Sequence, residues 1–517
     1  MGERLRASAW WSAPLATVTV LTLAWLLAPP MGTDLAAQVA RADFFARYGW
    51  TPIDFGWYGG VSPFGYSLLS PPLMASLGGG IAGAKLLGAL AGLASTLGVT
   101  VLLRRSGAAR PVIAGVLAAG CMVGNLVSGR VTFALGVAFG VLALVLVTPP
   151  RPYRVAVALA AAAATASSPV VGLFVGVAAV AWWGSGWRDH RRRADGVALL
   201  LGTCPLLLVM VVMFGAGGVM NISGVDAVRG MAACLLVALA ARRRPIQVAA
   251  AICGAGVAAA YLVPTPVGLN VLRLPMLFAI PCVVAYSPPW RWSRALVPGF
   301  GVLLALTLPP VSVPDLRAAG DPAAAPSYFT SLRTGVAAAA PVGRIEVVPL
   351  ANYWDSAYFP ATAPLARGWL RQADIDRNGL FFDGRLTADT YYRWLLENAV
   401  SLVAVSTAEP SWVGRAEKRL INAGLPYLIE QWHDDQWTVY LVAGSTPLVA
   451  GLTRSDQRSL EFAAPTAGDI SVRVRWSPWL RLDGGGCLAR NGAFVIARVT
   501  AGRHRIAGAV VGRGPYC

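Results

Sequence analysis

Residues 81–103 read IAGAKLLGALAGLASTLGVTVLL, and Arg104 and Arg105 follow directly. This run holds one charged side chain, Lys85, and it is long enough to cross a bilayer, whose hydrocarbon core needs about 20 apolar residues of helix. An apolar run that ends in arginines is typical of a transmembrane helix that stops at a basic loop.

The same pattern recurs along the first 312 residues. Of the whole chain, 56% is hydrophobic and only 13% is charged, whereas a soluble domain is charged over roughly a quarter of its residues. We therefore predict an α-helical polytopic membrane protein with about eleven transmembrane helices, although Ser167, Ser168 and Pro169 could mark a kink in one long helix. The predicted spans are 10–30, 81–103, 110–128, 131–148, 154–168, 170–185, 195–214, 226–241, 245–263, 268–287 and 294–312.

The arginines between these spans predict the orientation of the chain in the plasma membrane. Basic loops stay in the cytoplasm, and every second loop is basic when the N-terminus is placed inside. The predicted cytoplasmic arginines are Arg4, Arg6, Arg104, Arg105, Arg110, Arg151, Arg154, Arg188, Arg191, Arg192, Arg193, Arg242, Arg243, Arg244, Arg291 and Arg294. The outside loops hold single arginines: Arg41, Arg47, Arg130, Arg229 and Arg273. Eleven spans then place the C-terminal region outside the cell.

The net charge of +18 has the same explanation. Nucleic-acid-binding proteins gather their basic residues on one face, whereas the arginines here stand in short clusters between apolar runs. We expect the lipid bilayer, and no nucleic acid, as the partner of this charge.

Outside the spans, two regions are expected to be folded. The first outside loop, 31–80, opens with an amphipathic pattern that predicts a helix at the membrane surface. From 313 to 444, mixed patterns predict an extracytoplasmic α/β domain, with strands near 344–350, 401–406, 427–431 and 436–442 and helices near 387–399 and 412–423. From 445 to 517, alternating apolar residues and glycine-rich turns predict a small β-sandwich domain. The transmembrane domain is expected to cover 1–312.

The cysteines and histidines suggest neither a metal nor a cofactor. Five cysteines stand in apolar runs, while Cys487 and Cys517 stand in the hydrophilic tail and could form a disulfide in an exported domain. No CxxC spacing occurs, and His433, Asp434 and Asp435 are more typical of a strand turn than of a metal site.

Asp34 is the strongest catalytic candidate. General base catalysis needs a carboxylate that can take a proton from the substrate, and Asp34 follows the first span at the membrane edge. The structural alternative is that Asp34 caps the helix that begins after it, where aspartate is favoured. Both roles are compatible.

Candidates for substrate binding lie in the same loop and at the outer ends of the spans. Asp54, Trp57 and Tyr58 could hold a sugar through hydroxyl contacts and aromatic stacking, or could instead be a turn with interfacial aromatics. For a phosphate the cationic candidates are Lys85, Arg130, Arg229 and Arg273, each of which could also extend its charge to the membrane interface. Arg273 interrupts the apolar string LNVLRLPMLF and therefore needs a partner, either an anionic lipid phosphate or a carboxylate such as Asp226.

Several strings together resemble the GT-C superfamily of membrane glycosyltransferases. They are GTDLAAQ at 32–38, WYGG at 57–60, SPPL at 70–73, AKLLGAL at 84–90, SGRVTFALG at 128–136, SSPVVGLF at 167–174 and LARGWLRQ at 365–372. The resemblance implies a polyprenyl-phosphate-linked sugar donor, a glycan or lipid acceptor in the cell envelope, and Asp34 as the acidic residue after the first helix.

Two other classes of protein fit the same architecture. A transporter or flippase would also have many spans, but such proteins often contain inverted repeats and interrupted helices, which the sequence does not show. A non-catalytic protein of envelope assembly could retain the same shape.

Overall fold

The computed structural model describes residues 2–148, 153–215, 217–288 and 293–517, without the side chains of 2–10 and 293–295. The chain forms two compact units. The helical unit contains Met1–Gln38 and Gly65–Ala319, and the strand-containing unit contains Val39–Phe64 and Gly320–Cys517. Among the predicted cytoplasmic arginines, Arg4, Arg6, Arg151, Arg291 and Arg294 lie outside the described side chains.

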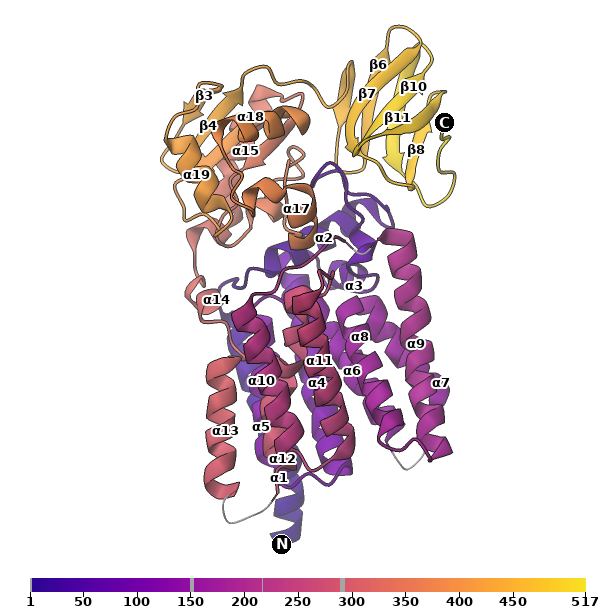
Figure 1. The fold of residues 1–517 in the computed structure, drawn as a ribbon. Helices are drawn as coiled ribbons and strands as arrows, with labels where there is room; N and C mark the ends of the chain where they lie inside the picture. Colours follow the sequence, from indigo (N-terminus) through magenta and orange to yellow (C-terminus); the bar gives the residue numbers. More distant parts are fainter. Residues whose placement is uncertain (1, 149–152, 216, 289–292) are drawn as a thin grey trace. The chain divides into compact units, whose positions relative to one another are not determined.

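Each predicted span corresponds to a helix of the helical unit (Figure 1). These helices are α1 Gly2–Leu27, α4 Gly80–Arg105, α5 Pro111–Val127, α6 Val131–Val147, α7 Arg154–Ser167, α8 Pro169–Gly184, α9 His190–Phe214, α10 Gly224–Ala240, α11 Arg244–Leu262, α12 Arg273–Tyr286 and α13 Ser293–Thr307. Among the described residues, four segments are long and apolar enough to cross a membrane: Gly80–Arg105, His190–Phe214, Arg244–Leu262 and Gly268–Tyr286. Several apolar helices are thus confirmed, whereas the count of eleven spans and the orientation remain predictions.

The break between α7 and α8 decides one open alternative. Ser168 is extended, with φ −154° and ψ 113°, and Pro169 begins the next helix. A residue before proline is driven out of the helical region, so 154–168 and 170–185 are two helices and not one kinked helix.

Small residues let the helices of this unit approach closely. A Cβ atom on Gly202 of α9 would lie 2.2 Å from the carbonyl oxygen of Ala158 in α7, and one on Gly140 of α6 would lie 3.1 Å from Val175 in α8. Such contacts are the usual basis of helix packing where water supplies no hydrophobic drive between helices.

The helix predicted for the first loop is present, but polar residues in it are buried as well as apolar ones. Helix α2 spans Leu35–Tyr48, and its apolar residues Leu35 and Val39 are buried, but so are Gln38 and Arg41, at 1% and 7% exposure. The expected solvated face is therefore enclosed by protein. A second short helix, α3 Ser70–Ser76, ends the loop.

The strand-containing unit begins with a four-stranded mixed sheet in the order β1-β2-β4-β3. Its strands are β1 Arg344–Val347, β2 Val400–Ser406, β3 Leu428–His433 and β4 Trp437–Val442, and its helices include α15 Thr330–Ala339, α17 Arg371–Arg377, α18 Ala388–Glu397 and α19 Gly414–Asn422. Helix α18 starts at a capping box, in which Thr387 and Thr390 satisfy each other's backbone N–H groups. The strands and helices predicted for 343–443 are confirmed.

The last part of the chain forms two antiparallel sheets, in the orders β7-β10-β9 and β5-β6-β11-β8. The strands are β5 Leu452–Ser455, β6 Ser459–Ala464, β7 Gly468–Arg475, β8 Leu480–Asp483, β9 Cys487–Asn491, β10 Phe494–Val499 and β11 Gly502–Gly508. Cys487 and Cys517 form the disulfide whose possibility the sequence raised. The strand-rich character is thus confirmed, while the division into domains at 313–444 and 445–517 remains a prediction.

A fully buried ion cluster joins β1, an edge strand of the mixed sheet, to α19. Arg367 contacts Glu346 of β1 at 2.6 Å and also Glu417 of α19, and its guanidinium carbon lies 3.8 Å from the centroid of the Phe381 ring. Tyr391 donates a hydrogen bond of 2.9 Å to Glu417. One cation faces two carboxylates, and burial raises the pKa of both Glu346 and Glu417. Burial therefore opposes the charged form of both carboxyl groups, while Arg367 favours it.

Arg367→Met should destabilise the protein far more than Glu417→Gln. Loss of the arginine leaves two carboxyl groups buried without a cation, which costs about 3–5 kcal/mol, whereas the glutamine leaves a neutral pair and should cost under about 1 kcal/mol. Thermal unfolding of the purified protein in detergent measures both changes. Equal losses of stability in the two variants would show that the charge balance does not govern this cluster.

Candidate active site in the helical unit

Two glycines bring the candidate base to its partners. A Cβ atom on Gly32 would lie 2.3 Å from the carbonyl carbon of Ser128, and one on Gly129 would lie 2.3 Å from the backbone nitrogen of Leu35. Both glycines also have positive φ angles, +91° and +74°, which other residues rarely adopt. The strings GTD and SGR therefore meet backbone to backbone, and Asp34 donates its N–H to the Ser128 carbonyl at 3.3 Å.

This approach places the Asp34 carboxylate between two arginines. Asp34 Oδ2 lies 3.3 Å from Nη2 of Arg273, the first residue of α12, and 3.5 Å from Nε of Arg130, the residue before α6. The three side chains are 22%, 16% and 25% exposed, in the order Asp34, Arg273, Arg130. They remain within reach of a ligand, and together they hold one net positive charge.

The expected partner of Arg273 is thus found, and it is Asp34. Asp226 instead accepts a hydrogen bond of 2.7 Å from Ser223 at the start of α10. The guanidinium carbon of Arg273 also lies 5.3 Å from the centroid of the Phe133 ring in α6, a cation–π contact that helps to hold a partly desolvated charge.

Polar side chains that sequence reasoning did not select support this cluster. Thr132 donates to the amide oxygen of Gln38 and also contacts the Ser70 hydroxyl at 2.7 Å. The backbone N–H of Thr33 donates to Asp315 Oδ1 at 3.1 Å. Asp315 belongs to the short helix α14, Val313–Arg317, and its one sequence signal is the capping pattern with Ser312.

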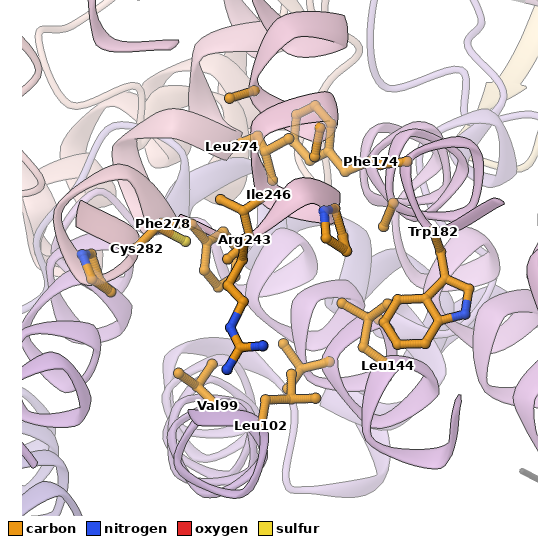
Figure 2. A pocket seen from close by; sticks show the side chains of 18 of the residues that line it. Val99, Leu102, Leu144, Phe174, Trp182, Arg243, Ile246, Leu274, Phe278 and Cys282 are labelled. Carbon is orange, nitrogen blue, oxygen red and sulfur yellow. The ribbon is translucent and has the colours of Figure 1, made fainter. Parts of the chain in front are cut away.

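An apolar cavity of about 700 Å³ lies between α4, α6, α8, α11 and α12. Figure 2 shows part of its lining, with Leu102, Phe174 and Phe278 projecting from three of these helices. The lining follows α6 from Phe133 to Val147, which at the helical rise corresponds to about 21 Å.

One end of the cavity adjoins the Asp34 cluster. Phe133 and Leu274 both line the cavity. The guanidinium group of Arg273 lies over the Phe133 ring, and Leu274 is the next residue in the chain after Arg273. The polar cluster thus adjoins the cavity through Phe133 and Leu274. Asp34, Arg130 and Arg273 do not themselves line it.

The other cationic candidates are not gathered here. Lys85 donates to the carbonyls of Trp25, Leu26 and Ala28 at 3.2, 3.2 and 2.5 Å, so it caps the C-terminal end of α1. Arg229 is exposed, and in the described part of the chain it has no recorded hydrogen bond or ion pair. Neither contact pattern supports phosphate binding.

The predicted sugar contacts of the first loop belong to the interior of the strand-containing unit. Asp54 accepts the Gly56 N–H at 2.8 Å, Trp57 donates to the carbonyl of Ser356 at 3.0 Å, and Tyr58 donates to that of Gly368 at 2.7 Å. All three candidates are at most 7% exposed. Their contacts favour packing over sugar binding, because no free aromatic face is left for a ligand.

The described residues contain no group of three or more metal-binding side chains. The polar cluster of the helical unit contains one carboxylate and two guanidinium groups, which are suited to proton transfer and anion binding.

Comparison with known proteins yields likenesses of fold alone. No protein-family model and no curated protein matches the chain. Among solved structures, the arabinofuranosyltransferase AftD from mycobacteria is 17% identical, with a TM-score of 0.46 over 89% of this chain and 41% of its own. ArnT from Cupriavidus metallidurans in the apo state is 16% identical, with a TM-score of 0.47 over 85% of this chain and 100% of its own.

The chain thus spans less than half the length of AftD. At these TM-scores the two likenesses add nothing about activity, so the functional proposal below rests on the geometry of the site.

The buried Asp54 should make stability depend on pH. Burial raises the pKa of Asp54 in the folded protein to about 7. The group therefore contributes to stability at pH values below its unfolded-state pKa, and this contribution is lost as the pH rises through the folded-state pKa. From pH 4 to pH 7 wild type should lose about 3 kcal/mol relative to Asp54→Asn.

Melting temperatures of both proteins across this pH range measure the effect. Asp435→Asn, a change at an exposed position, serves as the control and should follow wild type. Parallel pH profiles of wild type and Asp54→Asn would contradict the proposed burial effect.

Proposed function

We propose that this protein is a membrane glycosyltransferase that moves a sugar from a polyprenyl-phosphate donor to a glycan or lipid acceptor of the cell envelope. The observation that supports the proposal is a carboxylate held by two arginines at the end of a long apolar cavity. Asp34, Arg130 and Arg273 form the polar part, and Phe133 and Leu274 connect it to the cavity.

The two parts of this feature match the two parts of a lipid-linked sugar phosphate. An apolar cavity that follows about 21 Å of helix suits part of a long isoprenoid chain. Guanidinium groups suit a phosphate, because their planar N–H donors pair with its oxygens. The two guanidinium groups favour an anion over a neutral headgroup.

Binding of the donor would also prepare the base. In the free protein both arginines contact the Asp34 carboxylate. A donor phosphate competes for the same N–H groups, so that donor binding would free the Asp34 carboxylate to meet the acceptor hydroxyl.

The proposed step is a direct displacement at the anomeric carbon. Asp34 takes the proton of the acceptor hydroxyl while the oxygen of that hydroxyl forms the new bond to the anomeric carbon of the sugar. The bond from the sugar to the phosphate oxygen breaks, and the polyprenyl phosphate leaves with the electron pair. Arg130 and Arg273 stabilise the charge that develops on the leaving phosphate.

Asp34→Asn should abolish transfer without preventing folding. A positioned base contributes about 10²–10⁴-fold to such reactions, so we expect a loss in that range, measured with a radiolabelled polyprenyl-phosphate sugar and native membranes. Arg273→Gln should reduce the rate by about 10²-fold or more, as loss of one anion-stabilising donor does elsewhere.

Asp226→Asn is the matched control, since Asp226 pairs with Ser223 and not with the arginines. It should retain wild-type transfer. Full activity of Asp34→Asn at equal expression would refute the base. Lipid flipping that survives in both aspartate variants, with no transfer by wild type, would identify a transporter instead.

The cavity can be tested separately from the base. Ala178 of α8 lines the cavity, and Ala178→Trp should raise the KM for a long-chain donor by about tenfold, since overfilling of a packed site costs 1–3 kcal/mol. A donor analogue with a short isoprenoid chain should be affected much less.

Val180 lies on the same helix, is 47% exposed and does not line the cavity. Val180→Trp should therefore leave both KM values unchanged. Equal effects of Ala178→Trp on long and short donors would exclude the cavity as the site of the lipid chain.

A further inference from the structure

Four arginines from three segments, β1, α17 and β7, meet in the strand-containing unit at the turn of residues 58–60. A Cβ atom on Gly59 would lie 2.8 Å from Nη2 of Arg344 and 3.4 Å from Cγ of Arg475. Arg475 donates from Nε to the Tyr58 carbonyl at 3.3 Å, and Arg377 donates from Nη1 to the Gly60 carbonyl at 2.9 Å. The fourth member, Arg473, precedes Arg475 on the same face of β7.

The buried member of this arginine cluster is Arg344, at 2% exposure. It donates from Nη1 to the Asn398 carbonyl at 2.5 Å and from Nη2 to the carbonyl of Arg473. Its Nε is buried and has no hydrogen-bond partner within the described structure. The other three are partly buried, and each guanidinium has further N–H groups beyond those bound to carbonyls.

No carboxylate neutralises the cluster. Among the described residues none of the four arginines forms an ion pair, and the acidic groups that act on Arg475, Asp376 and Glu397, are both exposed. Four arginines of the neighbouring strands each have a carboxylate within 4 Å. These pairs are Arg454 with Asp456, Arg481 with Asp483, Arg498 with Asp469 and Arg505 with Glu461.

Gathering these charges is unfavourable without an anion. Burial and the neighbouring guanidinium groups lower the pKa of Arg344 to about 9 and that of Arg475 to about 10. Each arginine therefore weakens the charged form of the next. An anion with two charges would offset this repulsion and would use the free N–H groups.

We propose that the arginine cluster of Arg344, Arg377, Arg473 and Arg475 binds a phosphate group. Phosphate offers several acceptor oxygens and up to two negative charges, and arginine recognises it through paired N–H donors. The ligand is either free phosphate or a phosphorylated saccharide. This site lies in the strand-containing unit and does not depend on the reaction proposed for the helical unit.

An aromatic ring beside the cluster could contact the sugar of a phosphorylated saccharide. The guanidinium carbons of Arg473 and Arg475 lie 5.6 and 5.2 Å from the centroid of the Phe494 ring on β10. A sugar attached to the phosphate could contact this ring through its apolar face.

Binding is measured by equilibrium dialysis of the full-length protein in detergent against radiolabelled inorganic phosphate and glucose 1-phosphate, at constant ionic strength. The double variant Arg473→Gln, Arg475→Gln should weaken binding at least tenfold. The paired control Arg454→Gln, Arg505→Gln removes the same charge from ion-paired positions and should bind like wild type.

Tighter binding of glucose 1-phosphate than of phosphate would identify a phosphorylated saccharide, and equal binding would identify the phosphate group alone. Arg473→Gln by itself, which changes no backbone hydrogen bond of the turn, keeps the test valid if the double variant fails to fold. Absence of saturable binding by wild type, or equal loss in the control, overturns the proposal and leaves the arginines as clips of the turn.

Discussion

The polar site of the helical unit depends on the close approach of two backbone segments at Gly32 and Gly129. Neither position has room for a Cβ atom, and both need a backbone conformation that glycine adopts without strain. This contact brings Asp34 against Arg130, while the start of α12 supplies Arg273. Close to a membrane, such charges are expensive alone and stable together, so the site exists only as an assembled set.

Two ion clusters of opposite composition show how burial separates ligand chemistry from stability. Asp34 has two arginines as partners and lies with them at 16–25% exposure. Arg367 has two glutamates as partners, and all three are at most 2% exposed. The first set can exchange its contacts for those of an entering anion. The second set is enclosed by protein, and its contacts stabilise the fold.

The apolar cavity and the small residues of the helices have a common origin. Helices in lipid pack through close contacts at glycine and alanine, and α6 approaches α8 at Gly140 in this way. Where larger side chains such as Phe174 and Phe278 stand between helices, a space of about 700 Å³ remains. In the proposed function this space would hold the isoprenoid chain of the donor, with the headgroup beside the Asp34 cluster.

The sequence alone determined the features that depend on local composition. Apolar runs predicted each helix between α4 and α13, and alternation predicted the strands of the tail, because hydrophobic period and length are properties of neighbouring residues. The sequence also selected Asp34, Arg130 and Arg273 from their unusual surroundings. It did not pair them, since residues 34, 130 and 273 belong to distant segments.

Only the tertiary structure decided which polar residues meet and which are enclosed. The sequence left Trp57 and Tyr58 open as sugar contacts or as interfacial aromatics. In the structure they donate hydrogen bonds to the carbonyls of Ser356 and Gly368. Lys85 looked like a phosphate ligand, yet it caps α1. An aromatic or charged side chain has the same local pattern in either role, and long-range packing, which no local pattern encodes, determines whether water, a ligand or a distant carbonyl satisfies it.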